Sequence, residues 1–558
     1  MNRLLLTEYQ QMPVPFGMSD WLTFWLILVI SVVNGIIMLF VGYKFLQVLQ
    51  LSGYKAKGYF EWIRASKAKY IGRLVILSFL STAALLVTNV LLEQLFVYKI
   101  LTYLGLLFYF LFCTIFIINM YNAPQKVPLK YTRRMNRLCA VLFLVVAAFS
   151  FFFMTASQLY IPYLEYGALG LTPVFLPLFV LVAYFITLPF EVINSKRYVR
   201  KAKKKLANEY PNIKIIGITG SFGKTSVKNI LSALLSTKYK VCATPYSYNT
   251  PLGLSKTILE KLNCECEIFI AEMGAKYVGD IKYLTEMATP DIGVITGIGN
   301  QHLATFGSQE NLIRTKAELI YNMKPNGKAY INTDTKYAKD LFDSFNKEKI
   351  ETSLGLTSGK VYVKNIKTTS EGSEFDLMLD GETVHAKTSL LGKHNVSNIL
   401  LAVAVAYDLG VDKESIVYAI SKLVAPSHRL AIVPSNNNIT VIDDAYNGNV
   451  EGTKVALEVL SEFEGKKIVI TPGLVELGKD EFNSNFGFGK DMAKVADFVI
   501  IDGVVNYESI SSGLEFGGFD TSKILRAGSL TQAVEVLNTI SSPGDVVLFE
   551  NDLPDNYL

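Results

Sequence analysis

The chain has 558 residues, half of them hydrophobic, and a formal net charge of +5. This length predicts two or three domains. The apolar excess lies in residues 1–195, so the sequence predicts a membrane module followed by a soluble α/β region. Its basic residues stand beside apolar segments, which indicates membrane topology and argues against nucleic-acid binding. The five cysteines offer neither a disulfide framework nor a paired zinc motif.

The first part of the chain predicts a multi-pass membrane domain. Five apolar runs long enough to cross a bilayer lie at about 21–43, 74–92, 100–120, 138–157 and 168–190. Basic residues concentrate between the first and second runs, between the third and fourth, and after the fifth. Because basic loops face the cytoplasm, this alternation predicts five spans in residues 1–195 with the N-terminus outside. A basic juxtamembrane linker is expected at 196–210.

A glycine-rich segment follows the linker. An apolar run, 213–218, leads into three glycines spaced three residues apart, and then into a lysine, two hydroxyl residues and a helical pattern. A strand, a glycine loop and a helix form the layout of a phosphate cradle, because backbone N–H groups and the helix N-terminus attract an anion. We therefore expect a nucleoside triphosphate here, although a chance glycine loop is the alternative. The expected binding residues are Gly220, Gly223, Lys224, Thr225 and Ser226.

The remaining motifs fit a nucleotide domain over 211–425. Strand and helix patterns alternate, which predicts a doubly wound sheet. A strand ends at Glu272, a position that suits a magnesium ligand. The strand at 291–296 leads to a loop with His302, and the helical run at 311–319 carries Lys316. A second βα pattern over 426–558 predicts a smaller Rossmann-like parallel sheet.

Several of these segments together resemble one protein family. They are Gly-Ile-Thr-Gly-Ser-Phe-Gly-Lys-Thr-Ser at 217–226, Ala-Glu-Met-Gly-Ala at 271–275, the His302 loop, Lys316, Leu-Gly-Lys-His-Asn-Val-Ser-Asn at 391–398, Ser-His-Arg at 427–429 and Val-Ile-Asp-Asp-Ala-Tyr-Asn-Gly-Asn at 441–449. In this order they resemble the Mur ligases, the ATP-dependent amide-forming ligases of peptidoglycan synthesis. The resemblance covers roughly 210–550 and is greatest to the members that add D-alanyl-D-alanine.

The resemblance implies a role for each matching residue. Lys224 would bind the outer phosphates, and Thr225 and Glu272 would bind magnesium. His302 would hold a second Mg²⁺ ion, together with Lys316 if that lysine is carbamylated. The expected nucleotide contacts are Asn395 and Asn398 near adenine, Arg429 at the γ-phosphate and Asp443 or Asp444 at the ribose, and the expected substrate contacts are Asn249, Tyr446 and Asn447. For Asn395, helix capping is the structural alternative.

The family chemistry implies ATP, two Mg²⁺ ions, a carboxylate acceptor and an amine donor that is an amino acid or short peptide. Five spans stand where the family has a soluble domain for the uridine nucleotide, so we expect a lipid-linked envelope precursor as acceptor, contact with membrane lipids, and a bacterial inner-membrane protein with cytoplasmic catalytic domains. A soluble UDP-linked muropeptide is the alternative acceptor. Two alternatives are not ligases: a component of an ATP-driven transporter or flippase, and a scaffold protein that binds ATP without hydrolysing it.

The last segment departs from the family pattern. The D-alanyl-D-alanine-adding members usually carry a lysine-glycine-serine-arginine run, where this chain has Leu-Phe-Glu-Asn-Asp-Leu-Pro-Asp-Asn at 548–556. Exposed acidic groups there would suit a free α-amino group or a basic amino acid and would repel a carboxylate. The identity of the amine therefore stays open at this point.

Overall fold

The computed structural model describes residues 18–66, 70–90, 98–121, 127–160, 167–299, 306–433, 435, 438–446, 448–475, 477 and 480–550. His302 and Asn447, two of the expected site residues, lie outside these ranges. The chain divides into two compact units, one formed mainly by residues 1–194 and the other by residues 195–553.

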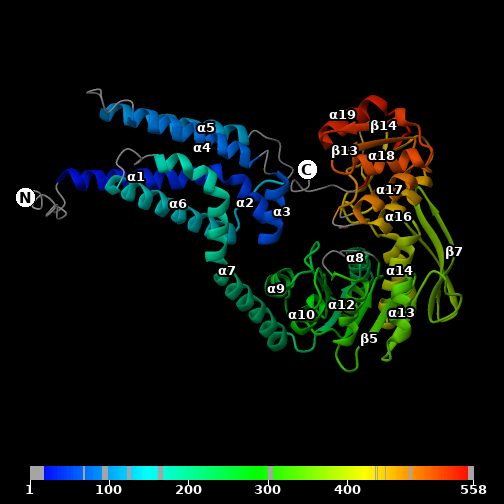
Figure 1. Ribbon diagram of the computed structural model, residues 1–558. Helices are drawn as coiled ribbons and strands as arrows, with labels where there is room; N and C mark the ends of the chain where they lie inside the picture. The colour runs from blue at the N-terminus through cyan, green and yellow to red at the C-terminus, as the bar shows by residue number, and fades with distance from the viewer. Residues whose placement is uncertain are drawn as a thin grey trace, which may run out of the picture. The chain divides into compact units, whose positions relative to one another are not determined.

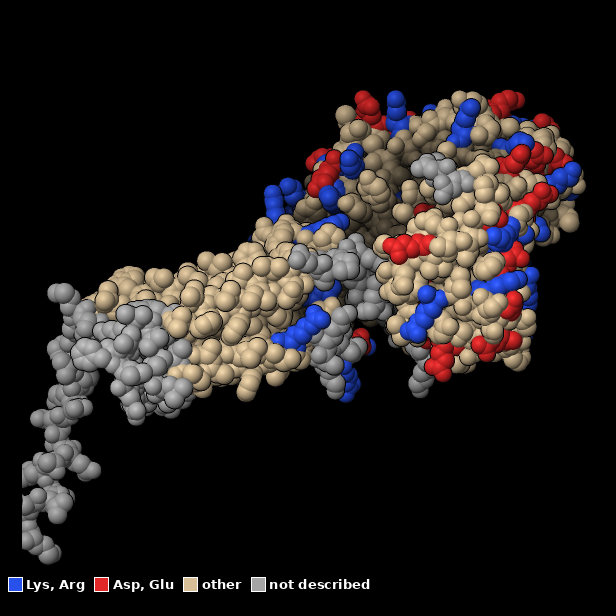
Figure 2. All heavy atoms as spheres, turned by 90° about the horizontal axis from the view of Figure 1, so that it is seen from above, with Lys and Arg blue, Asp and Glu red and all other residues tan. Residues whose placement is uncertain are grey.

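The first unit is helical. Its elements are α1 (Met18–Val41), α2 (Tyr43–Leu51), α3 (Ala56–Ser66), α4 (Ile71–Val90), α5 (Tyr98–Tyr121), α6 (Arg133–Tyr160) and the first part of α7 (Gly167–Glu209), with α1 beside α6 and α4 beside α5 (Figure 1). Four helices are long and apolar enough to cross a membrane, within Trp21–Val41, Leu104–Tyr121, Arg133–Ser157 and Leu169–Glu209, and a further apolar helix, Ile71–Val87, is shorter. On the face seen in Figure 2, the described surface of these helices is almost free of charged side chains except at one end.

Polar contacts fix the packing inside the helical unit. Asn34 of α1 donates to Ser150 Oγ of α6 at 2.8 Å and accepts from the Tyr109 hydroxyl of α5 at 2.5 Å. Because a buried amide is costly unless it is hydrogen-bonded, these contacts specify how three helices meet. In α3, Tyr59 is fully buried and donates to the Pro177 carbonyl at 3.1 Å, so this segment packs against the unit and is not a solvated loop.

The second unit is built on a parallel sheet. Its strands are β1 (Lys214–Thr219), β2 (Val241–Ala243), β3 (Ile268–Glu272), β4 (Ile292–Ile295), β5 (Lys328–Asn332) and β6 (Lys349–Thr352), in the order β2-β3-β1-β4-β5-β6. Side chains alternate across it: Ile216 and Ile270 enter the core under α8 (Lys224–Leu235), α14 (Lys393–Asp408) and α15 (Lys413–Ser421). Ile215 and Phe269 enter the opposite core, under α9 (Pro251–Glu260), α10 (Asp280–Met287), α12 (Gln309–Tyr321) and α13 (Lys336–Ser344). The predicted doubly wound sheet is confirmed.

Two further sheets complete this unit. An antiparallel sheet of β7 (Val361–Thr369), β8 (Gly372–Leu379) and β9 (Glu382–Thr388), which the sequence analysis did not anticipate, packs into the α14 core. The C-terminal sheet has the order β10-β11-β15-β12-β13-β14 and is mixed, because β10 (Ala431–Val433) is antiparallel to β11 (Thr440–Asp444). Its other strands are β12 (Lys467–Thr471), β13 (Phe498–Asp502), β14 (Ile524–Ala527) and β15 (Val546–Glu550), flanked by α16 (Val450–Ser461), α17 (Glu481–Met492), α18 (Tyr507–Phe516) and α19 (Leu530–Ile540). This order makes the ends of β11 and β15 neighbours.

Candidate active site

A cavity of about 870 Å³ lies in the second unit and collects most of the residues expected from the sequence. It is lined by the loop before α8, by the ends of β3 and β5, by α12 and α14, and by residues of the C-terminal sheet. The expected residues that line it are Gly223, Lys224, Thr225, Ser226, Asn249, Glu272, Lys316, Asn395, Asn398, Arg429, Asp444 and Tyr446. Gly220 and Asp443 are described but do not line it.

The glycine loop has the shape of an anion cradle. Gly223 has φ +75°, a left-handed conformation that favours glycine, and a Cβ there would lie 2.8 Å from Asn398 Oδ1. A Cβ on Gly220 would lie 2.1 Å from Thr296 Oγ1, so this position also excludes a side chain. Lys224 begins α8, and its ammonium donates to the Gly220 and Ser221 carbonyls at 2.9 and 3.1 Å. Burial lowers the pKa of Lys224 to about 8.

Glu272 is the centre of a buried polar cluster beside this loop. Its carboxylate accepts from Thr225 Oγ1 at 3.1 and 3.2 Å and from Asn249 Nδ2 at 3.1 Å. It also forms an ion pair with Lys228 at 3.1 Å, in which both side chains are almost fully buried. Lys228 donates in addition to the Tyr246 carbonyl. Lys228 was not among the residues expected from the sequence, although its position one helical turn after Lys224 places both lysines on one face of α8.

Lys316, on α12, is buried against the same cavity, with 3% of its surface exposed. Its ammonium forms no hydrogen bond to a described residue. Burial and the neighbouring charge of Lys224 hold the pKa of Lys316 well below its usual range. Burial thus shifts the equilibrium of this side chain toward its neutral amine form.

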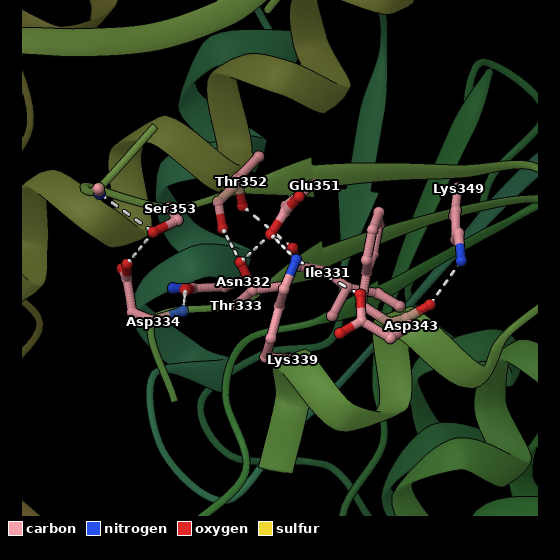
Figure 3. A network of polar contacts seen from close by, with 12 residues as sticks. Ile331, Asn332, Thr333, Asp334, Lys339, Asp343, Lys349, Glu351, Thr352 and Ser353 are labelled. Atoms are coloured by element: carbon pink, nitrogen blue, oxygen red, sulfur yellow. Dashed lines mark hydrogen bonds and ion pairs between the residues drawn. The ribbon is translucent and has the colours of Figure 1, made fainter. Parts of the chain in front are cut away.

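The ends of β5 and β6 form another part of the cavity wall, which the sequence analysis did not single out. Asp334 follows β5 and accepts from Ser353 Oγ at 2.7 Å (Figure 3). A second hydrogen bond comes from the Leu354 N–H at 2.9 Å. Asp334 also accepts from Ser397 on α14, one residue before Asn398. Asn395 donates to the Leu391 carbonyl at 2.9 Å, while the N-cap of α14 is Gly392, so Asn395 is not the capping residue. An aspartate two residues after the end of a strand was the available signal for Asp334.

The C-terminal sheet supplies the opposite wall. Arg429 reaches the phosphate loop, where Nη2 donates to Thr225 Oγ1 at 3.4 Å, and its guanidinium lies 4.7 Å from the centre of the Tyr446 ring. The Tyr446 hydroxyl donates to Ser247 Oγ at 2.9 Å. Of the two aspartates that were expected as alternatives, Asp444 lines the cavity, whereas Asp443 accepts from His428 Nδ1 at 2.7 Å. Both walls thus meet at Thr225.

Glu550 ends β15 and is not exposed, which corrects the expectation for this acidic residue; residues 551–558 lie outside the described ranges. Glu550 pairs in register with Asp444 at the end of β11, it is fully buried, and it lines the cavity. Neither Glu550 oxygen accepts a hydrogen bond from a described donor. Burial raises the pKa of Asp444 to about 6 and, together with the charge of Asp444, raises the pKa of Glu550 well above its usual range.

Comparisons with known proteins agree with this arrangement. A family model for the Mur ligase middle domain matches residues 218–406, and one for the Mur ligase glutamate ligase domain matches residues 428–550. The chain is 30% identical over 341 residues to the UDP-N-acetylmuramoyl-tripeptide–D-alanyl-D-alanine ligase of Synechocystis sp., which covers 61% of this chain and 71% of that protein. The chain belongs to the Mur ligase family.

Other relatives place this Mur ligase near the same members. It is 33% identical over 270 residues to the ligase of that name from Buchnera aphidicola, covering 48% of this chain and 58% of that protein, so this alignment spans little more than half of the relative. The structure of MurF from Thermotoga maritima in complex with ADP superposes with a TM-score of 0.57 at 28% identity, covering 64% of this chain and 80% of that one. MurF from Acinetobacter baumannii gives 0.57 at 25% identity, covering 64% and 77%. The protein is a Mur-ligase-type, ATP-dependent ligase, and residues 1–194 precede both family-model matches.

The residues of this Mur ligase fit a magnesium ion at one position. The oxygens of the Thr225 hydroxyl and the Glu272 carboxylate lie within 3.2 Å of each other at the cavity, and both are suitable ligands for a metal ion. Among the described residues, no group of three His, Cys, Asp or Glu side chains could hold a metal. Such a sparse protein shell suits Mg²⁺, which keeps several waters and is usually bound by one or two protein oxygens and substrate phosphates.

Proposed function

We propose that this chain is a membrane-bound ATP-dependent carboxylate–amine ligase that forms an amide bond through an acyl phosphate and adds an amino acid or short peptide to a cell-envelope precursor. The observation that carries the proposal is the single cavity in which Lys224, Glu272, Lys316 and Arg429 converge, in a chain that also has four long apolar helices. Lys224 and Arg429 bring positive charge from two walls to the Thr225 hydroxyl and to Glu272 at the end of β3. Transfer of a phosphoryl group between two oxygens requires such neutralisation of charge.

The phosphate end of the cavity neutralises charge in this proposal. Backbone N–H groups of the Gly220–Gly223 loop and the Lys224 ammonium hold the β- and γ-phosphates. In the structure Lys224 donates to two loop carbonyls. A charged phosphate oxygen is a stronger hydrogen-bond acceptor than these neutral carbonyls, so it would take over the Lys224 N–H groups. Arg429 enters from the C-terminal wall and reaches the γ-phosphate, which couples closure of that wall to the presence of ATP.

Thr225 and Glu272 would hold Mg²⁺, and the ion would supply neutralisation of charge on the transferring phosphoryl group. Ser226, the next residue of α8, supplies a further hydroxyl and N–H to the phosphates. Lys316 is proposed to react with carbon dioxide through its neutral amine: an N–C bond forms, one N–H proton is released, and the resulting carbamate would be an oxygen ligand for a second ion. His302, the other proposed ligand of that ion, lies outside the described residues.

The remaining site residues position the nucleotide and the substrates. Asn395 and Asn398 on α14 contact the adenine side, and Asp444 contacts the ribose; Asp443, the alternative, is held by His428 instead. Asn249, Tyr446 and Asn447 contact substrate. The Tyr446–Ser247 hydrogen bond supports this proposal for Tyr446, because it joins the two walls beside the Asn249 turn.

In the proposed reaction, a carboxylate oxygen of the acceptor attacks the γ-phosphorus of ATP, and ADP leaves. The amine of the donor then attacks the acyl carbon, the bond to phosphate breaks, and one amine proton is released. The protein contributes positioning and electrostatic stabilisation, and no side chain acts as a nucleophile.

The membrane helices support a lipid-linked acceptor. A precursor with a lipid tail is confined to the membrane that the apolar helices would cross. The acceptor and the enzyme would therefore diffuse within the same membrane, which raises the frequency of their encounters. Every second segment between the apolar runs is rich in basic residues. In bacterial inner-membrane proteins such segments face the cytoplasm, which supports a cytoplasmic catalytic part. The relatives are UDP-N-acetylmuramoyl-tripeptide–D-alanyl-D-alanine ligases, which favours the second candidate, a soluble UDP-linked muropeptide with the helices as an anchor.

Two measurements test the proposal. ADP and phosphate should form only when both a carboxylate acceptor and an amine are present, whereas acceptor-independent ATP hydrolysis coupled to lipid movement would indicate a transporter instead. Mass spectrometry of lipid-linked envelope precursors should show one species that disappears in cells with Lys224→Ala. If the mass difference occurs only in soluble UDP-linked precursors, the second acceptor is correct.

A further inference from the structure

Three exposed apolar side chains stand beside the cavity of the second unit. Tyr246 is 82% exposed, Leu252 45% and Val278 50%. They come from the turn after β2, from the first turn of α9 and from the connection between β3 and α10. These segments are joined, because the Gly274 N–H donates to the Asn249 carbonyl at 2.8 Å. We call Tyr246, Leu252 and Val278 the apolar rim.

The backbone holds Tyr246 outward at a cost. Its φ is +48°, a left-handed conformation that is strained for a residue with a side chain. Its carbonyl accepts from the ammonium of Lys228, which also pairs with the buried Glu272. The fold thus fixes an aromatic ring on a strained turn and buries little of it. Such an arrangement indicates a contact with something outside the domain.

The C-terminal part of α7 packs on the side of the central sheet that carries the apolar rim. Val199, Ala202 and Leu206 share one core with α9 and α10. The Tyr198 hydroxyl donates to Glu260 Oε1 of α9 at 3.4 Å. α9 and α10 lie side by side (Figure 1). The long helix that contains the last apolar run therefore ends on the layer of the rim.

A short series of contacts leads from this part of α7 to the rim. Lys256 lies one helical turn before Glu260 on α9, and its ammonium is 5.4 Å from the centre of the Tyr248 ring. The Tyr248 ring centre is 6.2 Å from that of Tyr246. The rim is thus only a few side chains away from the helix that would enter the membrane.

The position of Tyr198 along α7 sets the scale. It follows Phe190, at the end of the last apolar run, by eight residues, which is about 12 Å of helix. The headgroup layer of a bilayer is about 5–8 Å deep on each side. If the apolar part of α7 spans the membrane, Tyr198 lies just beyond the headgroups, within reach of a side chain.

Basic side chains accompany the rim. Lys256 and Lys276 are exposed beside it, and the neighbouring carboxylate of Asp280 accepts from the Lys276 N–H at 2.9 Å. The exposed basic residues of α7 in this part are Lys196, Arg197, Arg200, Lys201, Lys203 and Lys204. Apolar and aromatic side chains flanked by lysine and arginine are typical of protein surfaces that lie at the interface of an anionic membrane.

We propose that the apolar rim docks on the headgroup layer of an anionic membrane, so that the cavity opens toward the membrane surface. The rim side chains enter the interface, and the basic residues of α7 and α9 pair with lipid phosphates. Asn249, Pro251 and Lys276 line the cavity and stand next to rim residues in the chain. An acceptor with a lipid tail therefore reaches the active site without leaving the membrane.

The inference rests on the proposed membrane-bound function and assigns a surface to it. A second copy of the chain and the glycan of the acceptor are the competing occupants of the rim, because either could cover an exposed tyrosine. Each of them has its own outcome in the test.

Photocrosslinking of the full-length chain in lipid nanodiscs tests the docking. Tyr246→p-benzoylphenylalanine keeps an aromatic ring and makes it photoreactive. In nanodiscs of equal parts phosphatidylglycerol and phosphatidylcholine, mass spectrometry should show phosphatidylglycerol adducts at position 246. Tyr418→p-benzoylphenylalanine is the matched control, because Tyr418 is 63% exposed on α15, on the opposite face of the sheet. It should give at least tenfold fewer lipid adducts.

Equal lipid labelling at positions 246 and 418 would overturn the inference. Adducts at 246 with the mass of a second chain would also overturn it, as would labelling that occurs only with added UDP-N-acetylmuramoyl-tripeptide. Equal labelling of the two lipids would refute the preference for an anionic surface.

Hydrogen exchange of the unaltered chain gives a measurement without a variant. Amides in 246–252 and 276–279 should exchange at least threefold more slowly in the nanodiscs than in detergent, while amides in 422–425, an exposed segment after α15, should not change. Unchanged exchange in all three segments contradicts the docking. Neither measurement contains ATP, so a lack of ligase activity leaves both results valid. A chain that does not enter nanodiscs would count against the proposed membrane-bound function itself, and with it against the docking.

Discussion

The buried ion pair between Lys228 and Glu272 gives the sharpest quantitative prediction. Lys228→Met removes the cation and keeps most of the side-chain volume. It leaves the Glu272 carboxylate 1% exposed without its countercharge, and it leaves the Tyr246 carbonyl without a donor. Breaking a buried pair by removing one partner costs about 3–5 kcal/mol. Glu272 keeps hydrogen bonds from Thr225 and Asn249, so we expect about 3 kcal/mol.

Urea unfolding of the detergent-solubilised chain, read by pulse proteolysis of the α/β unit, measures this loss. With a dependence of about 3 kcal/mol per molar urea, the midpoint should fall by about 1 M. Lys339→Met is the matched control: Lys339 pairs with Glu351 at 2.8 Å in the same domain, but its side chain is 44% exposed. Exposed pairs contribute less than about 1 kcal/mol, so its midpoint should move by no more than about 0.3 M.

The double variant Lys228→Met, Glu272→Gln separates pairing from packing. With no buried charge left, it should recover at least 1 kcal/mol relative to the sum of the two single variants. The reasoning fails if Lys228→Met destabilises no more than Lys339→Met, or if the two changes at 228 and 272 are additive. In either case, the charge of Glu272 would be compensated by its other partners.

Three further predictions concern the cavity. Gly223→Ala forces a Cβ against Asn398 Oδ1 and should weaken ADP binding at least tenfold by calorimetry; Gly279→Ala, also at positive φ but with nothing within 4 Å, should leave it unchanged, and equal effects would contradict the steric argument. Arg429→Met should weaken a non-hydrolysable ATP analogue at least tenfold and ADP less than threefold, whereas equal losses would remove Arg429 from the γ-phosphate. Burial lowers the pKa of His394 from 6.5 to about 4. Between these two pH values the imidazole stays neutral in the folded chain but takes up a proton in the unfolded chain. The contribution of His394 to stability is therefore fully present above pH 6.5 and is lost as the pH falls toward 4. The part lost between pH 6.5 and 5 is at most about 2 kcal/mol, since the ring is partly exposed, and His394→Gln should unfold in urea with that much less acid sensitivity; an identical pH profile would refute the assignment.

The sequence by itself determined the parts that depend on local pattern. The Gly-Lys-Thr-Ser segment after an apolar run requires a strand, a loop and a helix in that order, because each residue acts on its own backbone neighbours. Alternating apolar strands and helical runs likewise required a doubly wound sheet, and uninterrupted apolar runs required long helices in residues 1–194. Glu272 could be placed at a strand end from its preceding residues alone.

Only the tertiary structure decided which distant residues meet. Lys228 became part of the site because α8 lies over β3, and Asp334 because the end of β5 faces α14. Asp444 and Glu550 are 106 positions apart in the numbering, and nothing local in either segment indicates that they are neighbours. The strand order β11-β15-β12 makes them neighbours and buries Glu550, so this acidic residue lies at the wall of the cavity. Strand order depends on how all the helices cover the sheet, which is a property of the whole domain and not of any one stretch.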